Sequence, residues 1–146
     1  DVTNRVKEGE AGFVVEFGRP GIGTRFRDIQ RVTKALAGMG VEFESNNPVT
    51  SLMSDSTRGL IRPDILNEKI LSAIVEIKTK LEMVPAVLRK IRELSREVGT
   101  VISIGVSTRC DGVGEEPLGE ILEREGYPAY RGKTNLGLAT RTVAQA

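Results

Sequence analysis

The segment GFVVEF at residues 12–17 is a short apolar run bounded by glycines, and such a run predicts a β-strand. A glycine turn, GIGTR at residues 21–25, follows soon after it. From residue 27 to residue 39 the apolar side chains recur every three or four positions, which predicts an α-helix, and residues 41–44 favour a second strand. Strand, turn, helix and strand in this order are typical of the start of an α/β layer.

The rest of the chain continues this alternation of helices and strands. Residues 64–82 keep a helical period, although the β-branched residues at 73–77 favour a strand as the alternative. The apolar positions between Val87 and Val98 predict an amphipathic helix. Residues 100–106 (TVISIGV) form the most strand-like segment, and their continuous apolar character predicts a central strand buried on both faces. Residues 117–126 predict a short helix.

Three shorter segments complete the prediction. Residues 45–51 (SNNPVTS) predict a loop, because asparagine and proline resist regular structure. Residues 127–130 favour a short strand, and the residues from 135 onward favour a terminal helix. A chain of 146 residues is expected to form one domain. We therefore expect a single α/β domain over residues 1–146, with a mixed central sheet in a three-layer-like arrangement.

The composition limits the chemistry that is open to the chain. Hydrophobic residues make up 39% and charged residues 28%, and the formal net charge is +1. These values indicate a globular protein rather than a disordered tail or a general polyanion binder. Histidine is absent and Cys110 is the single cysteine, which excludes Cys/His zinc clusters, histidine-dependent nucleophiles and an internal disulfide. Any bound metal is expected to have oxygen ligands, with magnesium as the first candidate.

The composition also bears on partners and location. Aromatic residues make up only 4% of the chain. Proteins that bind single-stranded nucleic acid stack its bases on aromatic side chains, so nucleic acid is not an expected partner. The sequence has no run of twenty apolar residues and no segment of the signal-peptide type. We therefore expect no membrane association and a cytoplasmic protein. Because the sequence begins at Asp1, residues that precede it are expected to be missing.

Two turns of similar composition are the main candidates for binding. GIGTR at residues 21–25 and GVSTR at residues 105–109 each place glycine, a hydroxyl and an arginine after an apolar run. Backbone amides, a hydroxyl and a guanidinium can converge on one phosphate, so both turns favour a nucleotide-binding domain. The alternative is that both are ordinary strand-to-helix turns. The candidate residues are Gly21, Gly23, Thr24, Arg25, Ser107, Thr108 and Arg109.

Two polar segments could add further contacts to a nucleotide. Asn46, Asn47 and Thr50 can donate to and accept from base edges or phosphates, although turn chemistry explains the asparagines nearly as well. Near the chain end, two cations lie beside two hydrogen-bonding groups, which suits a second anion, a subunit interface or a solvated turn. These residues are Arg131, Lys133, Thr134 and Asn135.

The segment GVSTRCDGVGEEP at residues 105–117 also contains candidate metal ligands. Asp111 is a candidate oxygen ligand for magnesium, and Glu115 and Glu116 could supply further oxygens. The alternative for the two glutamates is that they favour the start of the following helix through its dipole. Cys110 has no histidine to activate it and is expected to be a passive thiol.

Four blocks of the sequence resemble one family. The blocks FGRPGIGTRFRDIQRVTKAL (17–36), ESNNPVTSLMSD (44–55), GVSTRCDGVGEEPLGE (105–120) and YRGKTNLGLATRT (130–142) resemble the HcgB-type guanylyltransferases of methanogenic archaea. That family acts in biosynthesis of the iron-guanylylpyridinol (FeGP) cofactor of the iron-only hydrogenase, in organisms that carry out methanogenesis. The resemblance spans essentially the whole chain.

The resemblance implies a fold, a partner and a reaction. The fold would be similar to that of inosine-triphosphate pyrophosphatases, and the protein would be a homodimer. The reaction would be transfer of GMP from GTP to a pyridinol hydroxyl with release of pyrophosphate. By their own chemistry, and not through the family, Arg25 and Arg109 are the candidates for neutralising charge at the α-phosphorus, and Asp111 is the candidate magnesium ligand.

Two other functions stay open. A nucleoside-triphosphate pyrophosphatase would use the same pocket but let water attack. A non-enzymatic nucleotide or phosphate-binding module would hold the ligand without turnover. The sequence leaves open whether the two glycine turns share one pocket and whether a second subunit completes the site.

Overall fold

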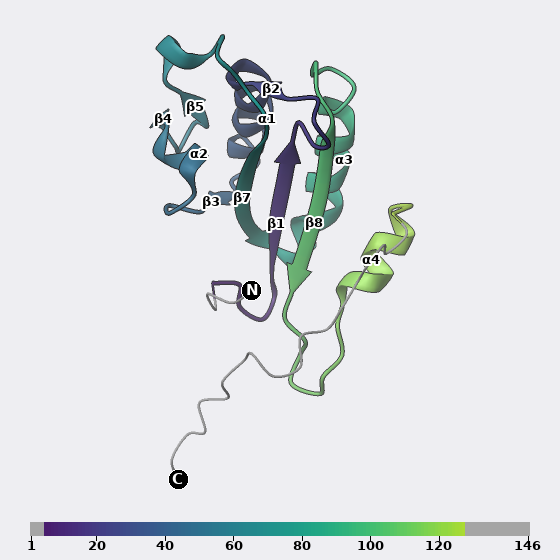
Figure 1. Cartoon of the computed structure of the whole chain (residues 1–146). Coiled ribbons are helices and arrows are strands. Elements are labelled where there is room, and N and C mark those ends of the chain that lie inside the picture. The colour runs from purple at the N-terminus through teal and green to yellow at the C-terminus, as the bar shows by residue number, and fades with distance from the viewer. Residues whose placement is uncertain (1–4, 128–146) are drawn as a thin grey trace.

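A computed structural model describes residues 5–127 of the chain, and its centre is a four-stranded antiparallel sheet (Figure 1). The strand order is β3-β7-β1-β8. These strands are β3 (Glu42–Phe43), β7 (Ala73–Lys80), β1 (Glu10–Phe17) and β8 (Ile102–Thr108). The protein is therefore mixed α/β, but the expectation of a mixed sheet is wrong for the described residues, because each strand pair in it is antiparallel.

The two long helices lie on the same face of the sheet. These helices are α1 (Phe26–Ala37) and α3 (Val84–Leu94), and Figure 1 shows both behind the sheet. The helix α3 connects β7 to β8, which lie on either side of β1. With the sheet, the two helices form two layers, so the expected three-layer arrangement is not what the described residues show.

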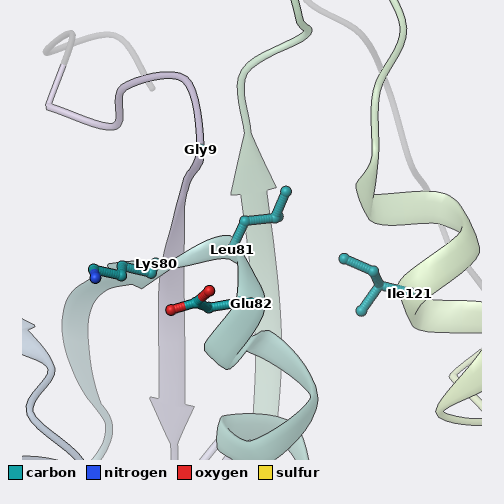
Figure 2. A pocket seen from close by; sticks show the side chains of 5 residues that line it. All are labelled: Gly9, Lys80, Leu81, Glu82 and Ile121. Carbon is teal, nitrogen blue, oxygen red and sulfur yellow. The ribbon is translucent and has the colours of Figure 1, made fainter.

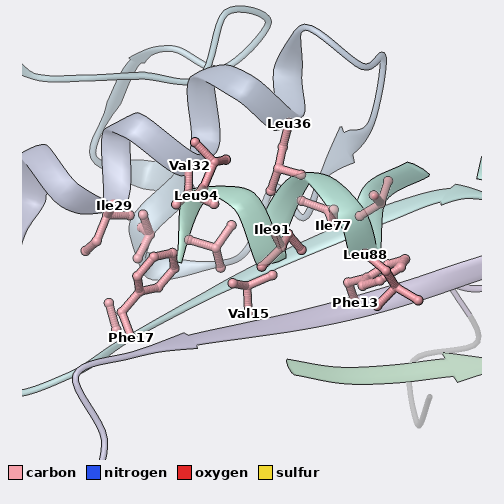
Figure 3. Packing of buried hydrophobic residues seen from close by; sticks show 14 of the residues in the cluster. Phe13, Val15, Phe17, Ile29, Val32, Leu36, Ile77, Leu88, Ile91 and Leu94 are labelled. Carbon is pink, nitrogen blue, oxygen red and sulfur yellow. The ribbon is translucent and has the colours of Figure 1, made fainter. Parts of the chain in front are cut away.

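The core lies between this sheet face and the two helices (Figure 3). Along β1 the fully buried side chains alternate, because successive residues of a strand point to opposite faces. On the helices the buried positions recur every three or four residues, as one apolar stripe requires. The central members of this core are Phe13, Val15, Phe17, Ile29, Val32, Leu36, Val75, Ile77, Leu88 and Ile91.

Small elements surround the sheet. Two short ribbons pair β2 (Thr24–Arg25) with β6 (Lys69–Ile70), and β4 (Met53–Asp55) with β5 (Leu60–Ile61). The short helices are α2 (Pro48–Ser51), α4 (Leu118–Arg124) and the 3₁₀ turns Pro63–Ile65 and Leu81–Met83. Within residues 5–127, no helix has both the length and the apolar character that crossing a bilayer requires.

Several sequence predictions of secondary structure are confirmed. The helices expected at residues 27–39, 87–98 and 117–126 correspond to α1, α3 and α4, and the strand expected at 41–44 corresponds to the two-residue β3. The loop expected at 45–51 is only partly correct, because its second half forms α2. Tyr127, the first residue of the strand expected at 127–130, is not in a strand. Residues 128–130 and the expected terminal helix lie outside the described residues.

Two predictions are wrong. The helix expected at 64–82 is replaced by the 3₁₀ turn, β6 and β7, so the alternative of a strand at 73–77 is confirmed. The side chains of β7 alternate between buried and half-buried, which the β-branched residues favour over the helical period. The strand at 100–106 exists as β8 but is neither central nor buried on both faces. It borders the sheet, with Ile104 half-buried and Gly105 exposed.

Candidate functional site

The two similar glycine turns lie at opposite ends of the sheet. The first turn follows the end of β1, where Phe17 pairs with Ile102. The second predicted turn is wrong for residues 105–108, which form the end of β8, where Thr108 pairs with Ala11 near the start of β1. Arg109 follows the strand. Seven residue pairs of antiparallel strand run from one end to the other, and the six steps between the end pairs span roughly 20 Å. One chain therefore does not bring the two turns together around a single phosphate.

In the first turn, the described hydrogen bonds fit the alternative of an ordinary turn. The backbone amides of Ile22 and Gly23 both donate to the carbonyl oxygen of Gly18, each at 3.0 Å. Gly21 and Gly23 have φ of +67° and +77°, a left-handed conformation that glycine adopts without strain. The turn uses its glycines for backbone geometry and its amides for its own closure.

The groups next to this turn are also engaged within the protein. The guanidinium of Arg25 donates to the carbonyl oxygen of Asn67, and the hydroxyl of the buried Thr24 contacts the carbonyl oxygen of Arg25. At the start of α1, the amides of Phe26 and Arg27 donate to backbone carbonyls at 3.3 and 2.9 Å. The first turn therefore joins β1 and α1 to the segment that precedes β6.

The end of β8 and the following Arg109 anchor the N-terminal segment. Nε of Arg109 donates to the carbonyl oxygen of Val6 at 2.8 Å, and the side chain of Val6 is 2% exposed. The hydroxyl of Thr108 donates to the carbonyl oxygen of Glu10 at 2.9 Å, while Ser107 is exposed on β8. The described contacts of Arg109 and Thr108 hold the chain that leads into β1.

Asp111, the expected magnesium ligand, accepts hydrogen bonds within its own loop. Oδ1 of Asp111 accepts from the amides of Val113 at 3.0 Å and Glu115 at 2.9 Å, which closes the loop after β8. The carboxylate of Glu116 accepts from the amides of Leu118 and Gly119, as expected for a glutamate at a helix start. Among the described residues, no group of three or more acidic or cysteine side chains could hold a metal ion.

The segment that contains Asn46, Asn47 and Thr50 is the part of the predicted binding site that borders a pocket. Oδ1 of Asn47 accepts from the amide of Val49 at 2.9 Å and caps α2. Nδ2 of Asn47 donates to Oε2 of Glu76 at 3.0 Å. The amide of Asn46 donates to Oε1 of Glu44, and Oγ1 of Thr50 is buried without a hydrogen-bond partner among the described residues. Turn chemistry therefore accounts for Asn46, whereas Asn47 lies between α2 and β7.

A pocket of about 480 Å³ lies beside Asn47, between α2, β7 and the sheet face that α1 and α3 leave open. We call it the α2 pocket. Its volume is within the range of small-molecule sites. The polar lining residues are Arg19, Asn47, Ser72 and Glu76. The apolar lining includes Val14, Phe26, Val49, Leu52, Ile70 and Ile74.

Sequence reasoning missed two polar residues of the α2 pocket. Glu76 is a single carboxylate within the apolar segment AIVEIK of β7. Arg19 lies two residues after the end of β1, and Nη1 of its guanidinium lies 3.7 Å from Oε1 of Glu16. An isolated charge inside an apolar strand was the signal that could have identified Glu76.

A second hollow of about 440 Å³ lies near the start of β1, at the other end of the sheet. Figure 2 shows Leu81 on one side of it and Ile121 of α4 on the other, with Lys80 and Glu82 nearby. Gly9 completes the lining. None of these five residues was expected in a site, and the two charged groups lie next to each other in sequence.

The carboxylate of Glu44, just before α2, is stabilised in its charged form. The amide of Asn46 is the main cause of its lowered pKa, and Arg5, whose Nη1 lies 2.6 Å from Oε2, also lowers it. The pKa of Glu10 is lowered in the same way by the amide of Lys7 and by Lys78. Both groups therefore prefer to be ionised in the folded protein.

These lowered pKa values predict a loss of stability in acid. A carboxylate whose folded pKa is below its ordinary value, 4.5 for Glu44 and Glu10, stabilises the fold above that value and loses this contribution as pH falls through the folded pKa. The melting temperature is expected to be constant near pH 6 and to fall below about pH 4.5. A combined Glu10→Gln and Glu44→Gln variant should show a smaller fall. A melting temperature that rises on acidification would contradict this prediction.

The candidates at the chain end, Arg131, Lys133, Thr134 and Asn135, lie outside the described residues. No family model, no curated protein and no solved structure matches the chain.

Proposed function

We propose that the chain is a guanylyltransferase that moves GMP from GTP to a pyridinol hydroxyl, releases pyrophosphate and serves biosynthesis of the iron-guanylylpyridinol cofactor. The observation that carries this proposal is the α2 pocket, which combines a nucleoside-sized volume and apolar walls with one carboxylate and one guanidinium. The resemblance of four sequence blocks to the HcgB-type family supplies the choice of reaction.

The proposed reaction asks little of acid–base catalysis. The pyridinol oxygen attacks the α-phosphorus, a phosphorus–oxygen bond forms, the bond to the bridging oxygen of the β-phosphate breaks, and pyrophosphate leaves. The hydroxyl is acidic enough to lose its proton to solvent, which suits a chain without histidine. The remaining tasks are to hold the two substrates in line and to neutralise charge at phosphorus.

Arg19 is the cation of the α2 pocket that could neutralise this charge. Its side chain is 54% exposed and is paired with Glu16 only at 3.7 Å, so it can turn toward a phosphate. Arg25 and Arg109, the first candidates for this task, do not line the α2 pocket and lie at opposite ends of the sheet. Within this proposal, the protein acts in the cytoplasm as a homodimer with a fold related to that of inosine-triphosphate pyrophosphatases.

The test is pyrophosphate release from each of the four ribonucleoside triphosphates, with magnesium present and with or without a substituted pyridinol. We expect release from GTP only when the pyridinol is added, together with a guanylylated pyridinol detected by mass spectrometry. Arg19→Ala is expected to slow this release by about 10- to 100-fold, the usual effect of losing a charge-assisted phosphate contact. Release from GTP without an acceptor would instead identify a pyrophosphatase.

A binding module without turnover is the second candidate. It is favoured by the contacts of Arg25 and Arg109, each of which donates to a backbone carbonyl rather than facing the α2 pocket. Nucleotide binding in the micromolar range without pyrophosphate release, with or without an acceptor, would favour this module over the transferase.

A further inference from the structure

We propose that Glu76 reads the Watson–Crick edge of a guanine base in the α2 pocket, with Asn47 holding the carboxylate in position. This inference rests on the proposed function, from which it takes a guanine nucleotide as the ligand. It adds the residue that selects the base and the direction in which the nucleotide lies.

The carboxylate of Glu76 is fixed by a chain of two hydrogen bonds. The amide of Val49 donates to Oδ1 of Asn47 at 2.9 Å, which orients the asparagine so that its Nδ2 donates to Oε2 of Glu76 at 3.0 Å. Asn47 is only 3% exposed, so surrounding side chains hold it in place. The base-reading group is therefore ordered before any ligand arrives, which lowers the entropy cost of binding.

The carboxylate keeps most of its hydrogen-bonding capacity for a ligand. An ionised carboxylate has about four acceptor positions, and Asn47 is the one hydrogen-bond partner of the Glu76 carboxylate among the described residues. Guanine presents two adjacent N–H donors, at N1 and at the 2-amino group, which match two carboxylate oxygens. Adenine presents a lone pair at N1, which the negative charge of Glu76 would repel.

The walls and length of the α2 pocket fit a nucleotide that lies along β7. Val14 of β1 and Ile74 of β7 share the open sheet face with Glu76, and Val49 and Leu52 approach from α2, so a flat base would contact apolar surface. Arg19 lies just beyond Phe17, the last residue of β1. Phe17 pairs with Ala73 of β7, and Ala73 is three residues from Glu76 along that strand. The two charged groups are therefore separated by roughly 10 Å of strand. With the base at Glu76, the phosphates would lie toward Arg19.

The first test measures binding of four nucleotides to the wild-type protein by calorimetry. The ligands are GMP, IMP, which lacks the 2-amino group, N1-methyl-GMP, which lacks the N1 hydrogen, and AMP. We expect GMP to bind most tightly and each lost donor to weaken binding by about tenfold or more, as for a hydrogen bond to a charged group. Equal affinity for all four would overturn the inference without any need for a variant.

The second test replaces the charged group. Glu76→Gln keeps an oxygen for Nδ2 of Asn47 but turns an amide donor toward the N–H donors of guanine, so GMP affinity is expected to fall about 10- to 100-fold. The ratio of GMP to IMP affinity should also approach one, which a merely structural role of Glu76 would not produce. Glu82→Gln, the same change in the other hollow, should bind all four nucleotides as the wild type does.

The outcomes separate this inference from the proposed function. A folded Glu76→Gln variant with wild-type affinity and selectivity would reject the role of Glu76, whether or not guanylyl transfer occurs. Guanine selectivity that depends on Glu76, in a protein that releases no pyrophosphate with a pyridinol, would keep the base-reading role and reject the transferase.

Discussion

Gly59→Ala is expected to lower the free energy of unfolding by about 3 kcal/mol or more, since a left-handed alanine costs about 1–2 kcal/mol and overpacking adds about 1–3. Gly59 has φ of +64° and packs directly against α1. A Cβ atom at this position would overlap the carbonyl group of Thr33 and lie 2.8 Å from the nitrogen of Lys34. Because these are backbone atoms of a helix, they cannot move aside as a flexible side chain would.

The same substitution also threatens a buried hydrogen bond. The hydroxyl of Thr33 donates to the carbonyl oxygen of Gly59 at 2.8 Å, and Thr33 is fully buried. Urea unfolding of the two proteins would measure the difference in stability. Gly40→Ala is the matched control, because Gly40 has a similar φ of +75° but no atom within 4 Å of the added Cβ. A loss for Gly59→Ala no larger than for Gly40→Ala would show that α1 does not pack where described.

Phe13→Ala is expected to cost about 3–5 kcal/mol, as for other large aromatic residues truncated in a core. Phe13 is fully buried on β1 and pairs with Ile77 on one side and Val106 on the other. Figure 3 shows it among the side chains between the sheet and the helices. With typical domain stabilities of about 5–15 kcal/mol, this single change would leave a marginal fold.

Val14→Ala is the control for this prediction. Val14 is the next residue of the same strand, but it points to the opposite sheet face and is half-buried. Its truncation is expected to cost about 1 kcal/mol or less, because fewer contacts are lost. Comparable losses for the two variants in chemical denaturation would contradict the assignment of the two faces of β1.

The sequence was sufficient to predict those elements whose signal is local. The apolar stripes of α1 and α3 repeat every three or four residues over three turns, and the apolar runs of β1 and β8 have glycine near their ends. In the sequence of β7, the apolar residues fit both a helical pattern and a strand pattern, and several of them are β-branched. Only the pairing of this segment with β1 decides between the two, and that pairing is not local.

The position of β8 illustrates the same limit. Its apolar residues predicted a strand buried on both faces, but Ser103, Gly105 and Ser107 all lie on the exposed face. Small side chains did not reveal that this face is open, since serine and glycine occur on both buried and exposed surfaces. The helix α3 connects β7 to β8 across β1, and this connection sets the order of the three strands. The composition of the segments does not specify that order.

The site was less predictable than the fold. The Gly-hydroxyl-Arg pattern predicted two phosphate-binding turns, but the described side-chain contacts of Arg25, Thr108 and Arg109 are hydrogen bonds to backbone carbonyls. Phosphate binding and ordinary chain connections use the same residue types. Asn47 was chosen for its hydrogen-bonding capacity and does line the α2 pocket. Its neighbours in that pocket, Arg19 and Glu76, come from segments far apart in sequence and meet only through the pairing of β1 with β7.

The placement of β1 between β7 and β8 also sets the order in which the chain can acquire its structure during synthesis. Residues 10–17 leave the ribosome before their strand partners, which are residues 73–80 and 102–108. The strand β1, which carries buried apolar side chains, therefore waits without its partners until nearly the whole described chain has been made. Such delayed, long-range pairing slows folding and exposes the nascent strand to aggregation. Chaperone demand should accordingly be greatest before translation reaches residue 108.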